Sequence, residues 1–437
     1  MMEVHRTHRA KIRNHSQVAE SLDRHGWAAS KLWNVANYHS RDVWEETGEI
    51  PDHEELKNEL KDHTKYKGLH SQSSQRVLEE LAEAFNSWYS SNDDRDNPPG
   101  YRKQNYHDQQ GRRVHEEHPR STVTWKQNGI RHDTKNNRVR LSKGANHKEH
   151  PKAWEYILVE YEPRPDVEVE NLQQVRAVYD NANERWELHL VCKDEIETSD
   201  SPGEETAGID LGISNFAAVA YSTEKADLYP GNRLKQDGYY FPKEIANCDD
   251  SGGERATRLR HKWSERRTHF FHSLAKHIVE RCVEKGVGCI NVGDLEGVRE
   301  DEDGYSKNWG KHGNLDLHGW AFDRFTSILA YKAKVKGIEV VEVSEHDTSK
   351  TCCVCGRDDD SQRVERGLYV CESCEAAFNA DVNGAENIRL DVNESNSESA
   401  PVLGGDRSTG WLAQPSVYLY DLSCGFQPQT EVVDCKP

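Results

Sequence analysis

Four cysteines near the C-terminal end of this 437-residue chain form two closely spaced pairs. Two residues separate the cysteines within each pair, and 15 residues separate the pairs. This spacing is typical of a site in which two tight turns present four thiolates to one zinc ion, and such a closed site is structural. The alternative is a chance cluster in a chain with 11 cysteines. The predicted zinc ligands are Cys352, Cys355, Cys371 and Cys374.

Three aspartates stand in contexts that suggest chemistry beside the zinc. Asp210 interrupts the apolar run TAGIDLGISNFAAVA, Asp294 lies near the end of GVGCINVGDL, and Asp381 opens DVNGAENI. A buried ionised carboxylate is costly unless it is paired or bound to metal. If folding gathers these acids, they could bind two Mg²⁺ ions about 4 Å apart and support phosphodiester cleavage. The local alternatives are a turn cap for Asp210 and a helix N-cap for Asp381.

A helix expected over residues 254–285 carries the densest group of cations in an acidic chain. The cations lie in the first half of this expected helix, and its apolar stripe lies in the second half. We expect them to contact a nucleic-acid backbone, and the alternative is a solvated face. The predicted nucleic-acid-binding residues are Arg255, Arg258, Arg260, Lys262, Arg266 and Arg267.

The net charge of −19 argues at face value against nucleic-acid binding, because phosphate contacts need Lys and Arg. The distribution of charge matters more than its sum, and acids crowd the turns. An acidic coat of this kind is expected of a protein from a salt-rich cytoplasm. The chain has no 18-residue apolar run and no signal-like start, and its remaining cysteines show no pairing rhythm. We therefore expect a cytoplasmic monomer or homodimer without a membrane partner.

The elements that must position these residues change character along the chain. A helical pattern with apolar residues at helical spacing follows the first strand, and short strands and turns follow residue 100. An acidic linker then precedes the apolar strands that carry Asp210 and Asp294. The length predicts two to four domains. The last 45 residues are Ser-, Asn- and Gly-rich at first and show no sustained period, which predicts disorder.

The order of these motifs resembles one known family. GIDLGI, INVGDL, SKTCCVCG with YVCESC, and ADVNGAENI are similar to motifs of the TnpB (OrfB) family of transposon-encoded RNA-guided nucleases, relatives of the type V CRISPR effectors. The resemblance is densest over residues 206–391. It implies an α/β fold with an RNase H-like RuvC core interrupted by a zinc ribbon. It also implies an N-terminal half, here expected as a β-barrel-like module with a helical insertion, that holds guide RNA and reads a short DNA motif.

The resemblance implies a domain order and two of the three acids. Asp210 and Asp381 match the family's metal-binding acids, but the family's middle Glu is Gly293 here. Asp294 is its neighbour, and adjacent strand residues point to opposite faces, so Asp294 would need a bulge to reach the metals. We favour Asp294; the alternatives are Glu296 or a loss of cleavage. The expected domains are the β-rich module (1–15 and 100–195), the helical insertion (16–99), the nuclease core (205–345 and 376–392), the zinc ribbon (346–375) and the tail (393–437).

Three functions are compatible with this reading. The first is a transposon-associated, RNA-guided, Mg²⁺-dependent DNA endonuclease whose partners are guide RNA and target DNA. The second is an RNA-guided DNA-binding protein that does not cut, because Gly293 replaces the usual Glu. The third is an actin-like phosphotransferase, since Asp-Leu-Gly-Ile on a first strand also fits that fold. The third reading leaves the zinc ribbon and the basic helix without a role.

Overall fold

The computed structural model describes residues 2–90, 97–147, 155–165, 167–196, 198–212, 214–294, 322–345, 348–359, 362–365, 367–390 and 410–429. The chain divides into two compact units. The N-terminal unit is Glu3–Glu195, and the C-terminal unit is Ile196–Pro437 together with the first two residues. Each unit has its own core.

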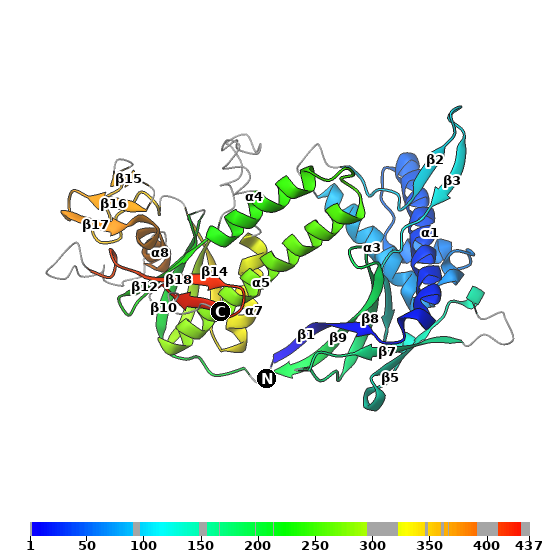
Figure 1. Ribbon diagram of the computed structural model, residues 1–437, viewed down its shortest axis with the longest axis horizontal. Coiled ribbons are helices and arrows are strands. Elements are labelled where there is room, and N and C mark those ends of the chain that lie inside the picture. The colour runs from blue at the N-terminus through cyan, green and yellow to red at the C-terminus, as the bar shows by residue number, and fades with distance from the viewer. Residues whose placement is uncertain are drawn as a thin grey trace. The chain divides into compact units, whose positions relative to one another are not determined.

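The N-terminal unit is built on a seven-stranded sheet (Figure 1). Its strand pairs β4–β8, β8–β9, β1–β7, β6–β7 and β5–β6 are antiparallel. The barrel-like closure stays a prediction, because the observed order has two edge strands. In spatial order the strands are β4 (Val123–Lys126), β8 (Leu172–Asp180), β9 (Arg185–Ile196), β1 (Met2–Ile12), β7 (Tyr156–Glu162), β6 (Arg138–Ser142) and β5 (Ile130–Asp133).

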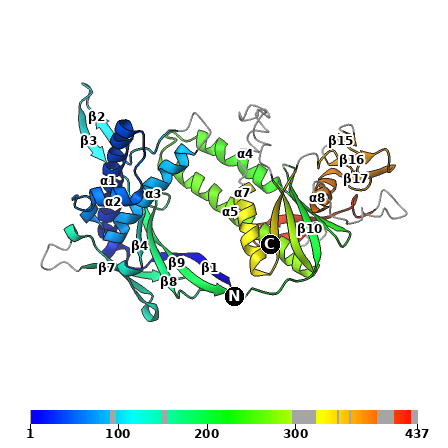
Figure 2. The same cartoon turned by 180° about the vertical axis from the view of Figure 1, so that it is seen from behind.

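Helices interrupt the strands of this unit directly after β1, and they lie beside the sheet (Figure 2). Apolar residues at helical spacing give each helix one buried face. These faces share a core with the sheet, in which Leu22, Phe85 and Trp125 are fully buried. The helices are α1 (His15–Thr47), α2 (His53–Leu60) and α3 (Ser71–Tyr89), with short 3₁₀ turns η1 (Tyr66–Gly68), η2 (Gln127–Gly129), η3 (Thr134–Asn136) and η4 (Ala145–His147) and a hairpin of β2 (Gln104–His107) and β3 (Arg113–Glu117).

The C-terminal unit contains a second seven-stranded sheet, which is mixed. Near its centre, the strand β10 (Glu205–Leu211) pairs in parallel with one neighbour and antiparallel with the other. In spatial order the strands are β14 (Glu339–Ser344), β13 (Val287–Asp294), β10 (Glu205–Leu211), β11 (Asn215–Tyr221), β12 (Lys225–Pro230), β18 (Ser416–Asp421) and β19 (Gly425–Pro428).

Separate clusters of apolar residues cover the two faces of this sheet. On one face, Phe216 stacks against Phe271 and Phe322, which come from α5 (Glu254–Glu284) and α7 (Phe322–Val335). On the other face, α8 (Ala380–Leu390) packs Val382 and Ala385 against Ala218. A further helix, α4 (Asn232–Ala246), packs along α5.

A small three-stranded sheet beside α8 carries the second cysteine pair (Figure 1). Its strands are antiparallel and lead directly into the helix, so that α8 begins at the residue after the last strand. The strands are β15 (Arg363–Glu365), β16 (Leu368–Cys371) and β17 (Ala376–Asn379).

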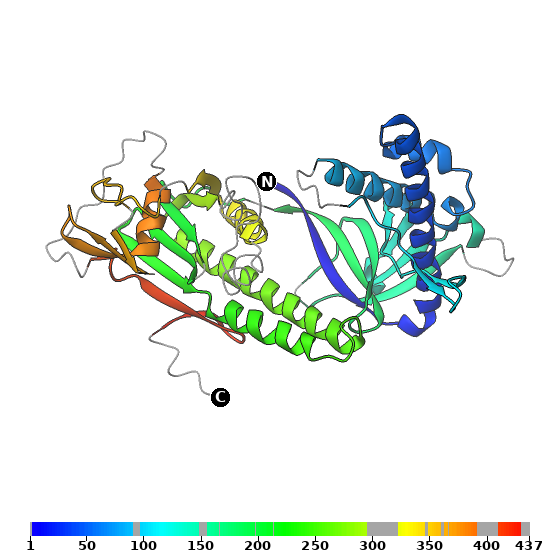
Figure 3. The ribbon, with the colours of Figure 1, turned by 90° about the horizontal axis from the view of Figure 1, so that it is seen from above.

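The expectation that the whole C-terminal tail is disordered is wrong for residues 410–429. Here β18 pairs in parallel with β12, and β19 closes an antiparallel hairpin on it (Figure 3, red). Tyr418 and Phe426 are buried against Tyr229, and this aromatic burial stabilises the hairpin. The Ser- and Gly-rich composition around this short segment concealed it. Residues 391–409 and 430–437 lie outside the described residues.

A helix must be both long and apolar to cross a lipid bilayer. Within the part of the chain that the structure describes, no helix is both long and apolar enough to span a membrane.

Candidate active site and metal centre

Asp210 lies on the strand β10, on the face that α8 covers. The backbone of α8 approaches this strand so closely that a Cβ at Gly208 would lie 2.1 Å from the carbonyl oxygen of Ala385. Two residues further along the strand, Asp210 has the same orientation. A Cβ at Gly384 would lie 2.7 Å from Oδ2 of Asp210. Glycines at both positions therefore let the helix lie directly over the carboxylate.

Asp381 lies in the first turn of α8. The helix is capped by Asn379, whose Oδ1 accepts hydrogen bonds from the backbone N–H groups of Asp381 and Val382, both at 3.1 Å. The carboxylate of Asp381 is used differently. Its Oδ2 accepts a hydrogen bond from Nδ2 of Asn215 at 2.7 Å. Since another residue caps the helix, Asp381 is left to face the sheet.

The two acids that the resemblance matched lie close enough for the charge of Asp381 to shift the pKa of Asp210. Its pKa is raised to about 7, first by burial and second by the negative charge of Asp381. The cationic Arg363 of β15 opposes that rise, and its Nη2 lies 3.6 Å from Oδ1 of Asp381. Two carboxylates held near each other in a partly buried site are the arrangement that a divalent cation neutralises.

Asp294 is the last residue of β13. This strand pairs regularly with β14 to its end, with Gly293 opposite Val343 and Asp294 opposite Ser344. Asn291 donates hydrogen bonds from Nδ2 to carbonyl oxygens at the end of α8, so alternation places Gly293 on the α8 face and Asp294 on the other. The β13–β14 pairing shows none of the bulge that Asp294 would need. Glu296 lies outside the described residues.

One acid near this site was missed by the sequence-based reading. Glu345 directly follows β14, the strand beyond β13. Its pKa is raised to about 9, first by burial and then by the charges of Asp210 and Asp294. Its Oε1 is buried and has no hydrogen-bond partner among the described residues. The signal that could have found Glu345 is its position directly after a strand, because the carboxyl ends of parallel strands meet at one edge of a sheet.

The four predicted zinc ligands converge. Sγ of Cys352 lies 3.8 Å from Sγ of Cys374, and Sγ of Cys355 lies 3.5 Å from Sγ of Cys371. All four sulfurs lie within 4.8 Å of one another, and no other group of three or more such ligands among the described residues meets this limit. This cluster fits the zinc ribbon expected from the spacing.

Both turns that present these sulfurs place a left-handed residue directly after the cysteine pair. In the first, the N–H of Gly356 donates to the carbonyl oxygen of Cys352 at 2.9 Å, and Gly356 has a φ of 70°. In the second, the N–H of Cys374 donates to Sγ of Cys371 at 3.4 Å, and the next residue, Glu375, has a φ of 49°. A left-handed residue after each pair turns the chain back toward the metal position.

The cysteine cluster is bonded directly to α8. Asn383 accepts a hydrogen bond on Oδ1 from the N–H of Cys353 at 3.0 Å, and its Nδ2 donates to the carbonyl oxygen of Thr351 at 2.8 Å. Asn387 donates to the carbonyl oxygens of Thr348 and Thr351, at 2.8 and 2.7 Å. Both asparagines are buried. A metal bound in the ribbon would therefore stabilise the segment that carries Asp381.

The basic half of α5 has two kinds of cation. Arg266 is an internal partner, because its Nε lies 2.7 Å from Oδ2 of Asp237 on α4, and Arg267 is partly buried. Arg258 pairs with Glu254 on its own helix, and Arg260 donates to the carbonyl oxygen of Ser251 at 2.7 Å. The side chains that remain exposed to solvent are Arg255, Arg258, Arg260 and Lys262.

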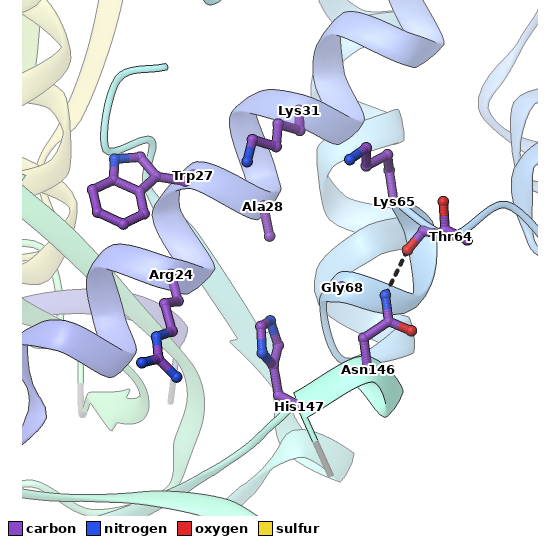
Figure 4. Close-up of a pocket in the computed structure, with 9 residues that line it drawn as sticks. All are labelled: Arg24, Trp27, Ala28, Lys31, Thr64, Lys65, Gly68, Asn146 and His147. Atoms are coloured by element: carbon purple, nitrogen blue, oxygen red, sulfur yellow. Dashed lines mark hydrogen bonds between the residues drawn. The ribbon is translucent and has the colours of Figure 1, made fainter. Parts of the chain in front are cut away.

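A pocket of about 270 Å³ lies in the N-terminal unit (Figure 4). Arg24, Trp27 and Lys31 line it from α1, and Lys65 and His147 line it from the segments opposite. None of the residues that line it is acidic. The pKa of His147 is lowered by burial and then by Arg24 and Lys143. Cations around an indole suit a phosphate next to a stacked base.

The fold and the cysteine cluster define a mixed α/β architecture of the Cas12 type. The cryo-EM structure of the Cas12f1–sgRNA–target DNA complex superposes with a TM-score of 0.54 at 14% identity, covering 85% of this chain and 82% of that chain. Two family models match separate parts of the sequence. The model for OrfB_IS605, a probable transposase, matches residues 189–299, and the model for the Cas12f1-like TNB domain matches residues 322–388.

Curated relatives agree with these matches. The TnpB-like protein ORF457 of Acidianus two-tailed virus is 27% identical over 248 residues, 49% of this chain and 52% of that protein. The CRISPR-associated endodeoxyribonuclease Cas12f1 of Sulfoacidibacillus thermotolerans is 24% identical over 229 residues, with the same two shares of 49% and 52%. The chain thus spans about half the length of these relatives. The likeness to TnpB proteins that the motifs predicted is confirmed.

Proposed function

We propose that this protein is a transposon-associated, RNA-guided, metal-dependent DNA endonuclease with a RuvC-like core. The observation that carries this proposal is the proximity of Asp210 and Asp381 beneath the start of α8, beside the four-cysteine ribbon. Relatives named TnpB-like and endodeoxyribonuclease support the reaction class. We propose the domain boundaries expected from the sequence, except that residues 410–429 join the sheet of the nuclease core.

The carboxylates fit a divalent cation by their chemistry. Oxygen donors are what Mg²⁺ prefers, and Asp210 and Asp381 offer them from two elements that close packing holds in place. The raised pKa of Asp210 indicates negative charge that the surrounding protein leaves largely uncompensated. When bound, two Mg²⁺ ions would polarise the scissile phosphate and stabilise the attacking and leaving oxygens. Asn215 orients Asp381 for that role, and α8 lies directly against the carboxylate of Asp210.

Guide RNA and target DNA are the proposed partners. Three cations and an indole around the N-terminal pocket, with no acid lining it, offer contacts for a phosphate and a base. The exposed cations of α5 offer further backbone contacts. Both features stand out in a chain with a net charge of −19. We propose a cytoplasmic monomer or homodimer with one structural zinc, adapted to high salt.

Cleavage of a plasmid tests this function. The purified full chain, loaded with a guide RNA, is incubated with a matching plasmid and Mg²⁺ over a range of KCl concentrations. We expect guide-dependent cleavage that Asp210→Ala and Asp381→Ala each abolish. The variant Asp249→Ala changes an exposed acid and should cut normally. Cleavage that persists in Asp210→Ala would contradict the proposal.

A second function, RNA-guided DNA binding without cleavage, is favoured by one observation, the glycine at position 293 where the resembled family has Glu. On this alternative the guide-loaded protein retards a matching DNA duplex in a gel, leaves the plasmid intact at all Mg²⁺ concentrations, and is unaffected by Asp210→Ala.

A further inference from the structure

The space beside Gly293 is filled by another acid. A Cβ built on Gly293 would lie 2.0 Å from Oε1, 2.5 Å from Cγ and 2.6 Å from Cδ of Glu345. The carboxyl group of Glu345 therefore occupies the volume into which a side chain at position 293 would extend. A residue larger than glycine at that position would require Glu345 to move.

This volume lies next to Asp210. The strands β10 and β13 are parallel neighbours, and Ile209 pairs with Val292. Asp210 and Gly293 each come one residue later, so they lie side by side on strands about 4.8 Å apart. Both are on the α8 face, as the contacts of Gly384 with Asp210 and of Asn291 with α8 show. Glu345 thus enters the site from the third strand, beyond Gly293.

The local structure after β14 directs Glu345 to this place. The hydroxyl of Thr348 donates to the carbonyl oxygen of Glu345 at 2.9 Å, and the N–H of Thr348 donates to the same oxygen at 3.2 Å. Asn387 of α8 in turn holds the carbonyl oxygen of Thr348 at 2.8 Å. Through Thr348, the carbonyl group of Glu345 is therefore connected by hydrogen bonds to the helix that carries Asp381.

Within the described residues, the carboxyl group of Glu345 is left partly without hydrogen-bond partners. Its Oε1 is buried without a hydrogen-bond partner among the described residues. Leaving a buried carboxyl oxygen without a hydrogen-bond partner is energetically costly. The charged groups that act on it are the acids Asp210 and Asp294, which oppose its ionisation. A carboxyl oxygen that is buried, unpaired and surrounded by acids is suited to bind a divalent cation.

From this geometry we infer that Glu345 is the third metal-binding carboxylate, supplied from β14 in place of a side chain at position 293. The inference rests on the proposed nuclease function, because it adds a ligand to the same centre. Asp294, the acid favoured by sequence, lies on a strand that pairs regularly to its end and is directed to the opposite face. The absence of Glu at position 293 therefore does not remove the third acid from the site.

Binding of Mn²⁺ to the guide-free full chain, measured by electron paramagnetic resonance, tests this inference without requiring activity. We expect Glu345→Gln to weaken Mn²⁺ binding by about tenfold or more, as Asp210→Asn and Asp381→Asn should. The matched control is Glu342→Gln, which changes an exposed acid on the same strand and should bind Mn²⁺ normally. Zinc content and melting temperature, measured for each variant, confirm that it is folded.

A paired substitution tests whether the two positions serve one site. Gly293→Glu alone should disturb the site, because the new side chain would overlap Glu345. Gly293→Glu combined with Glu345→Gly should recover Mn²⁺ binding and guided cleavage to within about tenfold of the natural protein. A folded double variant that recovers neither would contradict the inference.

The outcomes separate this inference from the proposed function. If Asp210→Asn and Asp381→Asn weaken Mn²⁺ binding while Glu345→Gln does not, the inference is wrong and the proposed function stands. Loss of Mn²⁺ binding in Asp294→Asn, with normal binding in Glu345→Gln, would assign the third position to Asp294. If none of the three substitutions at Asp210, Asp381 and Glu345 affects Mn²⁺ binding, the metal-dependent function itself fails.

Discussion

Nη2 of Arg363 lies 3.6 Å from Oδ1 of Asp381 and places a cation from the cysteine ribbon at the edge of the acidic site. The same guanidinium opposes the rise in the pKa of Asp210. The ribbon therefore contributes charge to the acids in addition to supporting the helix that carries one of them. Arg363 is substantially exposed, so its contribution is limited by solvent screening.

Arg363→Gln should tighten Mn²⁺ binding to the guide-free protein by about two- to fivefold, because the guanidinium competes with the metal for Asp381. Titration of Mn²⁺ at low ionic strength measures the change. Arg357→Gln is the control, since this ribbon arginine pairs with Asp359 and Glu372 instead. Weaker binding in Arg363→Gln would show that the arginine supports the metal site rather than competing with it.

Cys371→Ser should leave the protein with less than one equivalent of zinc and a lower free energy of unfolding, by several kcal/mol, because metal binding is coupled to folding. Metal analysis and thermal unfolding measure both effects. Cys353→Ala is the matched control: Cys353 is buried beside the cluster, but its sulfur is not among the four that converge. Full zinc content in Cys371→Ser would refute the assigned ligands.

Asp210→Asn should change the pH dependence of stability in protein free of divalent cations other than zinc. The pKa of Asp210 is raised from 3.8 to about 7 in the folded state, so the folded protein binds an extra proton between these values. Its stability therefore falls as pH rises through this window. The amide lacks this charge, so we expect Asp210→Asn to gain on the order of 2 kcal/mol over the natural protein between pH 5 and pH 8.

Urea unfolding at the two pH values measures this difference, with Asp249→Asn as an exposed control. A gain that is the same at pH 5 and pH 8 would show that the carboxylate of Asp210 is not destabilised by its surroundings.

Neutralising Arg258 and Lys262 together should weaken nucleic-acid binding and flatten its salt dependence, because both are exposed on α5 and each phosphate contact contributes about 0.9 to the slope. Filter binding from 0.1 to 0.5 M KCl measures the slope. Arg266→Gln provides the contrast. It should lower the melting temperature and leave the slope unchanged, since Arg266 pairs with Asp237 inside the unit. An unchanged slope in the double variant would make this face an ordinary solvated surface.

The four cysteine ligands and the acids Asp210 and Asp381 could be identified as candidates from the sequence because their signals are local. A four-cysteine site needs tight turns with fixed spacing, and an acid within an apolar strand stands out by its cost of burial. The motif order around Asp210 and Asp381 added the expectation that they meet. The bonds from Asn383 to the first cysteine turn join residues 30 and 32 positions apart, and nothing in the spacing showed them.

The position of Glu345 was decided by tertiary structure. In the sequence Glu345 is one of 76 acidic residues and lies 52 positions after Gly293. Only the parallel pairing of β10, β13 and β14 places Glu345, at the end of β14, in the space beside Gly293 on β13. The tail hairpin has the same origin, because its stability comes from aromatic side chains that distant strands supply. Residue types and spacing thus determined which chemistry this chain can perform. Long-range strand register decided which acids share the site, because register depends on contacts that no local pattern contains.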